Sequence, residues 1–318
     1  MTLYNNFIGI DIGKYNFVVA SYGSKDTKEY ENNHSGIDIF MKDYKDMLSD
    51  SLYILETTGG YEMQLLLTLC EQNFRVHRAN TRMVKNFIRS LGNAAKTDNL
   101  DAKALAFYGF ERGERLELFK PQSEKAFELY ELVQRRNDLK QMLIAEKNRI
   151  KSPRVNITKV SLDAVIEVIS EQLEGISDQI NDLIESDECL AVRKKIIKTV
   201  PGIGDIVANE LLVLLPELGK LDRRKIASLA GLAPRANDSG TFSGYRRTGH
   251  GRNLIKPTLF LAAMAARNSN SELKVFYEKM INRGKKKMVA LTALMRKIIV
   301  IANARLKYFG TEQLAIKI

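Results

Sequence analysis

The chain has 318 residues, of which 45% are hydrophobic and 27% are charged, so a disordered or fibrous protein is excluded. Its two cysteines, Cys70 and Cys189, cannot build a disulfide scaffold and belong to no paired metal-binding motif, which favours a reducing compartment. The N-terminus lacks the pattern of a signal peptide, and the longest apolar stretches are short or interrupted by charges. We therefore expect a cytoplasmic protein with no membrane span.

The basic residues are unevenly distributed along the chain. There are 49 Lys and Arg against 38 Asp and Glu, a net charge of +11. Residues 241–318 hold 16 of the basic and 3 of the acidic residues, so the whole excess lies in the last quarter. A basic field at one end indicates a polyanionic partner, most often a nucleic acid, although a well-solvated helical surface has the same composition.

The first part of the chain alternates between apolar runs and turns. Strands are predicted over residues 7–12, 16–21, 52–55 and 74–77, with a helix over residues 63–72. A further helix is predicted to start at Asp98, with Thr97 as its N-cap. This order predicts an α/β or α+β domain with one central sheet.

From about residue 122 the pattern becomes helical. Helices over residues 123–150 and 160–187, separated near residue 153, predict an antiparallel hairpin. In the first helix, Arg136 and Glu146 interrupt the apolar register. The second helix has a heptad seam, which either joins two protomers or packs only within its own domain. The seam consists of Ile169, Leu173, Ile176, Ile180 and Leu183.

The region beyond residue 192 contains a glycine-rich turn and a polar loop. Gly202 and Gly204 follow Pro201 between two apolar helices, a helix-hairpin-helix pattern that either offers backbone N–H groups to a phosphate or only connects the helices. A loop of small and polar residues is expected over 237–252. Further helices are predicted over residues 224–232, 254–266 and 288–307.

These patterns predict α/β plus α architecture in three domains. Residues 1–121 form the α/β domain, residues 122–188 the helical coiled-coil hairpin with a possible role in oligomerisation, and residues 189–318 the basic, mainly helical domain.

Four carboxylates are candidates for a catalytic site. Asp11 and Glu56 each end an apolar strand, and Asp98 and Asp101 project from one face of a helix start. Singly, they are also explained as turn or helix-capping residues. Converging carboxylates repel one another unless divalent cations hold them, and all-oxygen ligation favours Mg²⁺ or Mn²⁺. Such a site suits phosphodiester chemistry.

The ordered set of motifs resembles a known family. GIDIG (9–13), ILETTGGY (54–61) and KTDNLDAKALA (96–106) look like the DEDD catalytic set of a RuvC-like domain, which has a ribonuclease-H-type fold. GLAPRANDSGTFSGYRRTGHGRNLIKPTLFLAA (231–263) is similar to the C-terminal domain of DEDD transposases of bacterial insertion sequences. These transposases form the insertion-sequence family numbered one hundred and ten, related to the Piv DNA invertases, and the resemblance covers nearly the whole chain.

The resemblance implies a function for Ser239. It would be the nucleophile that forms a transient phosphoserine link to DNA, while Asp11, Glu56, Asp98 and Asp101 form the metal-dependent site. The resemblance also implies a bacterial cytoplasmic protein and an element-encoded bridge RNA as guide. Because recombination holds at least two DNA duplexes together, we expect a dimer or tetramer. Serine and carboxylates then meet either within one chain or across protomers, and the resemblance favours the second. By itself, Asp238-Ser239-Gly240 is an ordinary turn triplet.

Basic side chains near Ser239 and in the last quarter are candidates for nucleic-acid contact, with solvated surface charge as the alternative. Together with Gly202 and Gly204, these candidates are Arg246, Arg247, Arg252, Lys285, Lys286 and Lys287.

Three functions compete at this point. The first is a DNA transposase or recombinase with a serine nucleophile, and the second is a RuvC-like nuclease or junction resolvase that uses water. The third is a nucleic-acid-binding protein without catalysis. A sugar or acetate kinase, whose core begins with a similar strand, lacks support because no further phosphate-binding glycine loop follows.

Overall fold

The computed structural model describes residues 4–47, 50–57, 59–90, 92, 97–121, 123–152, 156–252 and 254–316. The chain divides into two compact units, residues 1–122 and residues 123–318. Within the described ranges, no helix has both the length and the apolar character needed to cross a membrane.

The first unit is built on a five-stranded mixed sheet with the order β3-β2-β1-β4-β5. β1 pairs antiparallel with β2, which pairs antiparallel with β3, whereas β1, β4 and β5 run parallel. The strands are β1 (Asn6–Ile12), β2 (Asn16–Ser21), β3 (Thr27–Glu31), β4 (Ser51–Glu56) and β5 (Arg75–Ala79).

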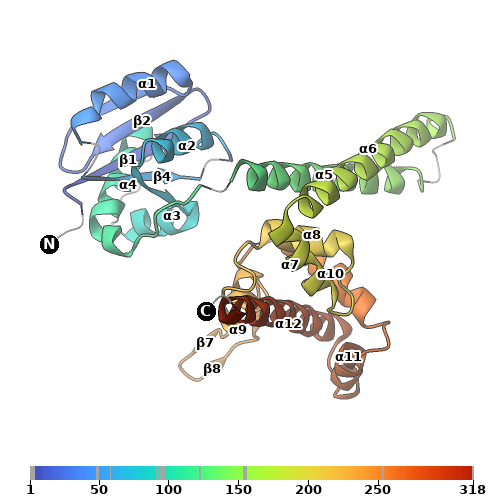
Figure 1. The fold of residues 1–318 in the computed structure, drawn as a ribbon. Coiled ribbons are helices and arrows are strands. Elements are labelled where there is room, and N and C mark those ends of the chain that lie inside the picture. The colour runs from blue at the N-terminus through green and yellow to red at the C-terminus, as the bar shows by residue number, and fades with distance from the viewer. Residues whose placement is uncertain are drawn as a thin grey trace. The chain divides into compact units, whose positions relative to one another are not determined.

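Helices cover both faces of this sheet (Figure 1). Because side chains alternate along a strand, Ile8 and Ile10 of β1 pack towards α1 and α2, while Phe7 packs on the opposite face with residues of α3 and α4. The helices are α1 (His34–Asp43), α2 (Met63–Glu71), α3 (Thr81–Ser90) and α4 (Asp98–Arg112).

Helix α4 lies unusually close to β1, and Gly9 is the reason. A Cβ atom at Gly9 would lie 2.1 Å from the carbonyl oxygen of Ala102 and 2.3 Å from the backbone nitrogen of Ala106. Just beyond the end of the helix, a Cβ atom at Gly113 would lie 2.8 Å from the ring of Phe7. The helix therefore runs antiparallel to β1, with its first turn towards the carboxyl end of the strand.

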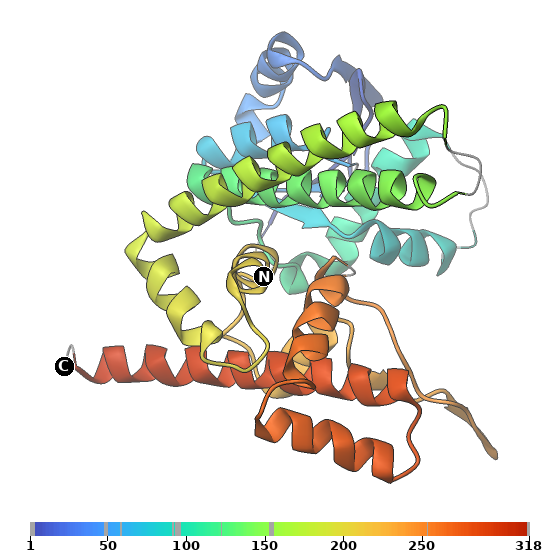
Figure 2. The ribbon, with the colours of Figure 1, turned by 90° about the vertical axis from the view of Figure 1, so that its right-hand side faces the viewer.

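The second unit is helical, with one hydrophobic core that takes side chains from all eight of its described helices. Figure 2 shows α5 and α6 side by side, and α12 as a long helix that α10 and α11 flank. The helices are α5 (Glu124–Arg149), α6 (Lys159–Glu185), α7 (Glu188–Lys198), α8 (Asp205–Leu214), α9 (Arg223–Leu229), α10 (Ile255–Ala266), α11 (Glu272–Asn282) and α12 (Lys287–Ile316).

The C-terminal part of the apolar seam of α6 packs within the chain. Ile180 is in the core of the second unit, and Ile176 and Leu183 pack against it. Arg136, which interrupts the register of α5, is buried and donates to Glu210 of α8 at 2.9 Å and to Ser177 of α6 at 2.9 Å. The interruption in the pattern is thus a buried ion pair that fastens the hairpin to α8.

The expected mixed α/β region followed by a helical region is confirmed, while the RuvC-like assignment stays a prediction. The two strands of the first hairpin and the helix starting at Asp98 lie where the patterns place them, and Thr97 accepts from the backbone N–H of Leu100. Patterning missed β3, α1, α3 and α11. Residues 153–155, where we expected the break between the two long helices, lie outside the described residues.

The domain division expected from the sequence stays a prediction, and the packing differs from it in one respect. Helices α5 and α6, which we expected as a separate middle domain over residues 122–188, share their core with the helices of residues 189–318. The reason is that Leu129, Val133 and Ile180 face the same cluster as the side chains of α8 and α10.

Candidate active site

Asp11 and Glu56 lie level with each other at the ends of neighbouring parallel strands. The β1–β4 register pairs Gly9 with Ile54 and Ile10 with Leu55, so the next residues in each strand are Asp11 and Glu56. Strand alternation places both on the face that α4 covers, together with Gly9. Both side chains are partly buried. The register therefore places Asp11 and Glu56 at the same level on adjacent strands, and their role in catalysis stays a prediction.

Helix α4 brings the other two carboxylates towards the same end of the sheet. Its antiparallel path over β1 directs its first turn, with Asp98 and Asp101, to the carboxyl ends of β1 and β4. Asp98 is exposed, and Asp101 is partly buried. The close approach at Gly9 sets this placement, because any side chain there would push the helix away from the sheet.

The chemistry of these donors suits a hard divalent cation, since all four are carboxylates. Among the residues that the structure describes, however, no group of three or more His, Cys, Asp or Glu side chains is arranged to hold a metal ion. The Mg²⁺ or Mn²⁺ site thus stays a prediction.

Asn32, which sequence reasoning missed, ties together the two loops that follow the strand-end carboxylates. Its side-chain amide donates to the carbonyl of Gly13 at 3.0 Å and to the carbonyl of Tyr61 at 3.0 Å. Gly13 follows β1, and Tyr61 follows β4. Because Asn32 is distant from both in the chain and has no motif around it, nothing in the local pattern identifies this contact.

Ser239 lies in the second unit, on a small β-ribbon. We expected a loop here; instead β7 (Asp238–Ser239) pairs with β8 (Phe242–Ser243), and β6 (Pro234–Arg235) pairs with β9 (Arg247–Thr248). Gly240 at the hairpin turn has a φ of 53°, which a residue with a side chain rarely adopts. Figure 2 shows the ribbon extending beyond the helices of its own unit. The Ser239 side chain is exposed at its outer end.

Asp238, next to Ser239, organises the ribbon. Its carboxylate accepts from the Ser243 hydroxyl at 3.3 Å and from the Gly244 backbone N–H at 3.2 Å, and it pairs with Arg246 at 3.6 Å. These contacts hold the turn in shape and leave the Ser239 hydroxyl outside the network of bonds described for Asp238.

Arg252 anchors the end of the segment that carries Ser239 to the helical core. Its guanidinium makes two bonds to Glu217, at 2.7 and 2.6 Å, and a third to the carbonyl of Leu214 at 2.8 Å. Burial acts to raise the pKa of Glu217. The hydrogen bonds and charge of Arg252, a backbone hydrogen bond and the charge of Lys220 together outweigh it and hold that pKa below its ordinary value. Contact of Arg252 with phosphate stays a prediction, and the structure gives this side chain a positioning role.

The other expected nucleic-acid contacts occupy two turns. Gly202 packs against α10, where a Cβ atom would lie 2.3 Å from the carbonyl oxygen of Ala262, so close helix contact already requires glycine there. Gly204 is exposed at the N-terminus of α8. Lys285, Lys286 and Lys287 are exposed where α11 ends and α12 begins. Their contact with nucleic acid stays a prediction.

Two family models match this chain. One, described as a transposase, matches residues 8–153, which include all four carboxylates. The other, described as the IS116/IS110/IS902 family of transposases, matches residues 194–278, which include Ser239.

The chain is also similar to curated proteins. The pilin gene-inverting proteins of Moraxella lacunata and Moraxella bovis are each 29% identical to it over 308 residues, 94% of either chain. The 43.6 kDa protein of insertion element IS110 from Streptomyces coelicolor is 30% identical over 155 residues, 48% of this chain and 37% of that protein.

Proposed function

Because this chain belongs to the IS116/IS110/IS902 family of transposases, we propose that it cuts and rejoins DNA with Ser239 as the nucleophile and the four carboxylates as a metal-dependent site. The observation that carries the proposal is the level placement of Asp11 and Glu56 beneath the first turn of α4. That arrangement directs all four carboxylates towards the carboxyl ends of β1 and β4, which supports a shared site there.

In the proposed reaction, the Ser239 oxygen forms an ester bond to phosphorus while the bond from phosphorus to one deoxyribose oxygen breaks. The proton that serine loses ends on the departing DNA hydroxyl. A hydroxyl of the partner strand then attacks the phosphoserine, restores serine and joins the strands. Each step exchanges one phosphoester for another, so rejoining needs no external energy source.

The carboxylate site supports this exchange. When bound, Mg²⁺ or Mn²⁺ supplies Lewis-acid stabilisation of the charge that develops on the phosphate oxygens. Asp11, Glu56, Asp98 and Asp101 are the side chains that would hold it. Asn32 is a positioning residue, because its two hydrogen bonds fix the loops after Asp11 and Glu56 relative to each other.

Ser239 and the carboxylates belong to different compact units. The proposal has them act on one phosphate in an assembly of two or four chains, with serine supplied by one protomer and carboxylates by another. The basic last quarter would hold DNA and a guide RNA, and Arg246, Arg247 and Lys285–Lys287 would contact phosphates.

The relatives favour strand exchange over hydrolysis. Pilin gene-inverting proteins match the chain over 94% of its length, and inverting a DNA segment requires that cut strands be rejoined. A nuclease that activates water would leave the ends separated. The phosphoserine intermediate is therefore the feature that distinguishes the two functions.

A covalent-trapping assay tests the proposal. Purified protein with its co-purifying RNA is incubated with end-labelled DNA from the flanks of its own gene and Mg²⁺, then separated on a denaturing gel. Wild type should give a labelled protein–DNA band that Ser239→Ala, Asp11→Asn and omission of Mg²⁺ each abolish. Thr241→Ala, which removes a neighbouring exposed hydroxyl, and Asp38→Asn, an exposed carboxylate on α1, are the matched controls.

Two outcomes would contradict the proposal. Cut DNA without a protein adduct, unaffected by Ser239→Ala, makes the protein a nuclease that uses water. If wild type binds DNA without cleaving it, and Asp11→Asn changes only the stability of the protein, the carboxylates have a structural role.

A further inference from the structure

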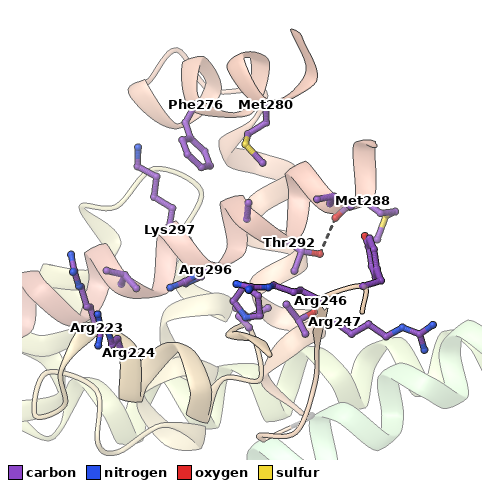
Figure 3. A pocket seen from close by; sticks show the side chains of 17 residues that line it. Arg223, Arg224, Arg246, Arg247, Phe276, Met280, Met288, Thr292, Arg296 and Lys297 are labelled. Carbon is purple, nitrogen blue, oxygen red and sulfur yellow. Dashed lines mark hydrogen bonds between the residues drawn. The ribbon is translucent and has the colours of Figure 1, made fainter. Parts of the chain in front are cut away.

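The second unit has a large pocket beside the β-ribbon that carries Ser239. It has a volume of about 1110 Å³ and is lined by residues of α9, α11, α12 and the segment from Leu232 to Thr248 (Figure 3). This volume is slightly above the range of about 300–1,000 Å³ that is typical of small-molecule sites. All of its lining residues belong to residues 123–318.

Six cationic side chains line this pocket, and no Asp or Glu does. Among the described residues, the one ion pair within 4.0 Å that involves any of the six is Arg246 with Asp238, at 3.6 Å. Arg223, Arg224, Arg246 and Arg247 are exposed, and Arg296 and Lys297 are partly buried. A surface lined by one sign of charge attracts an anionic occupant. The six are Arg223, Arg224, Arg246, Arg247, Arg296 and Lys297.

The remaining lining is largely apolar and includes flat or flexible side chains. Phe276 and Met280 of α11 lie opposite Arg296 and Lys297 of α12 (Figure 3). The Lys297 ammonium lies 4.4 Å from the centre of the Phe276 ring, a cation–π contact. A free phosphate ion would bind to the cations but would make no favourable contact with this apolar surface.

The pocket leads towards the nucleophile. A second pocket, of about 700 Å³, shares Tyr245, Arg247 and Thr248 with the first. It is also lined by Asn237 and Phe242, and Phe242 is the cross-strand partner of Ser239. A chain molecule lying in the first pocket could therefore continue along the base of the ribbon to the serine.

We propose that this pocket binds an unpaired nucleic-acid strand, with its phosphates on the arginines and an unstacked base against Phe276 and Met280. In duplex DNA the bases are stacked and paired, so the apolar lining would have no partner. In a single strand the bases are free to stack on aromatic side chains. The inference rests on the proposed function, because strand exchange exposes an unpaired strand next to the attacking serine.

Fluorescence anisotropy with labelled probes tests the pocket on the full-length protein. The probes are a thymidine 12-mer of DNA, a uridine 12-mer of RNA and a 12-base-pair DNA duplex. Phe276→Leu keeps an apolar side chain but removes the ring, so it should weaken single-strand binding about fivefold or more and leave duplex binding unchanged. Its matched control is Phe127→Leu on α5, a partly exposed ring outside the pocket.

The charge contribution is tested by Arg247→Gln/Arg296→Gln. For single strands the slope of log affinity against log salt should become shallower by about 0.7 for each phosphate that the variant no longer neutralises. Arg135→Gln/Lys195→Gln removes the same number of charges from the same unit, outside the pocket, and should leave the slope unchanged. Thermal unfolding of each variant shows whether the fold is retained.

Single-strand binding that both pocket variants leave unaltered would overturn the inference. So would a 12-residue polyglutamate peptide that binds as tightly as the 12-mers and is insensitive to Phe276→Leu, since charge alone would then explain the pocket. A preference for DNA or for RNA supports the inference and identifies the strand. If wild type forms the Ser239 adduct but the pocket variants bind single strands as well as wild type does, this inference alone is refuted. If single-strand binding depends on the pocket but no adduct forms, the proposed function alone is refuted.

Discussion

At residue scale, the absence of one methyl group sets the geometry of the carboxylate site. Gly9 lets the backbone of α4 approach β1 so closely that a Cβ atom would overlap the carbonyl oxygen of Ala102 and the backbone nitrogen of Ala106. Both obstacles are backbone atoms, which cannot rotate away as a side chain can. The position of the first turn of α4, which carries Asp98 and Asp101, depends on this contact.

Gly9→Ala should therefore damage both stability and activity. Overpacking of this kind costs about 1–3 kcal/mol in the free energy of unfolding, measured by chemical denaturation. Displacing the carboxylates should slow DNA cleavage on the order of 100-fold. Gly175→Ala is the control, because a Cβ atom on this α6 glycine meets nothing within 4 Å; it should stabilise by about 0.5–1 kcal/mol. Unchanged cleavage by Gly9→Ala would show that the helix start does not position the site.

At the scale of elements, a buried ion pair joins the helical hairpin of α5 and α6 to helix α8. The side chains of Arg136 and Glu210 are 7% and 5% exposed, so both charges are removed from water. Glu210 also accepts from the Thr258 hydroxyl of α10. A buried pair of this kind contributes little net stability but makes the loss of either partner expensive, because the other charge is then buried alone.

A double-mutant cycle on this pair should show strong coupling. Arg136→Met is expected to cost about 3–5 kcal/mol in the free energy of unfolding. Arg136→Met/Glu210→Gln should recover most of that loss, since glutamine is uncharged and still accepts from Thr258. Lys28→Met, which breaks an exposed pair with Asp43, should cost less than about 1 kcal/mol. Additive losses in the double variant would contradict the coupling.

At the scale of the whole molecule, charge is separated along the chain. The net charge of +11 comes from the last quarter, where three exposed lysines stand at the positive end of the α12 dipole. Cations placed there repel the helix end as well as one another, and a bound phosphate would relieve both. Contacts from this region should accordingly account for most of the counterions that DNA releases on binding.

The salt dependence of duplex binding measures this contribution. Neutralising Lys285, Lys286 and Lys287 to glutamine should make the slope of log affinity against log salt shallower by up to about 2.7, or about 0.9 for each phosphate contact. A variant that neutralises three exposed lysines of the first unit serves as control and should keep the wild-type slope. Its changes are Lys25→Gln, Lys42→Gln and Lys45→Gln. Equal changes in the two variants would mean that the charge acts without a defined contact.

Much of the first unit could be predicted from its local sequence. Alternating apolar residues and glycine turns place β1 and β2, and Thr97 followed by two aspartates places the start of α4, because each signal lies within a few residues of the element it specifies. Helix α11 was missed, since its exposed face and short length leave a weak apolar pattern between two stronger helices.

The sequence by itself determined many of the helices and strands, which residues carry carboxylates and cations, and the family to which the chain belongs. Tertiary structure alone decided that Asn32 joins two loops, that Arg252 pairs with Glu217 and that six cations share one pocket. The reason is physical. Periodicity along a chain records which face of an element is buried, whereas the partner across that face is chosen by packing between segments that are distant in sequence.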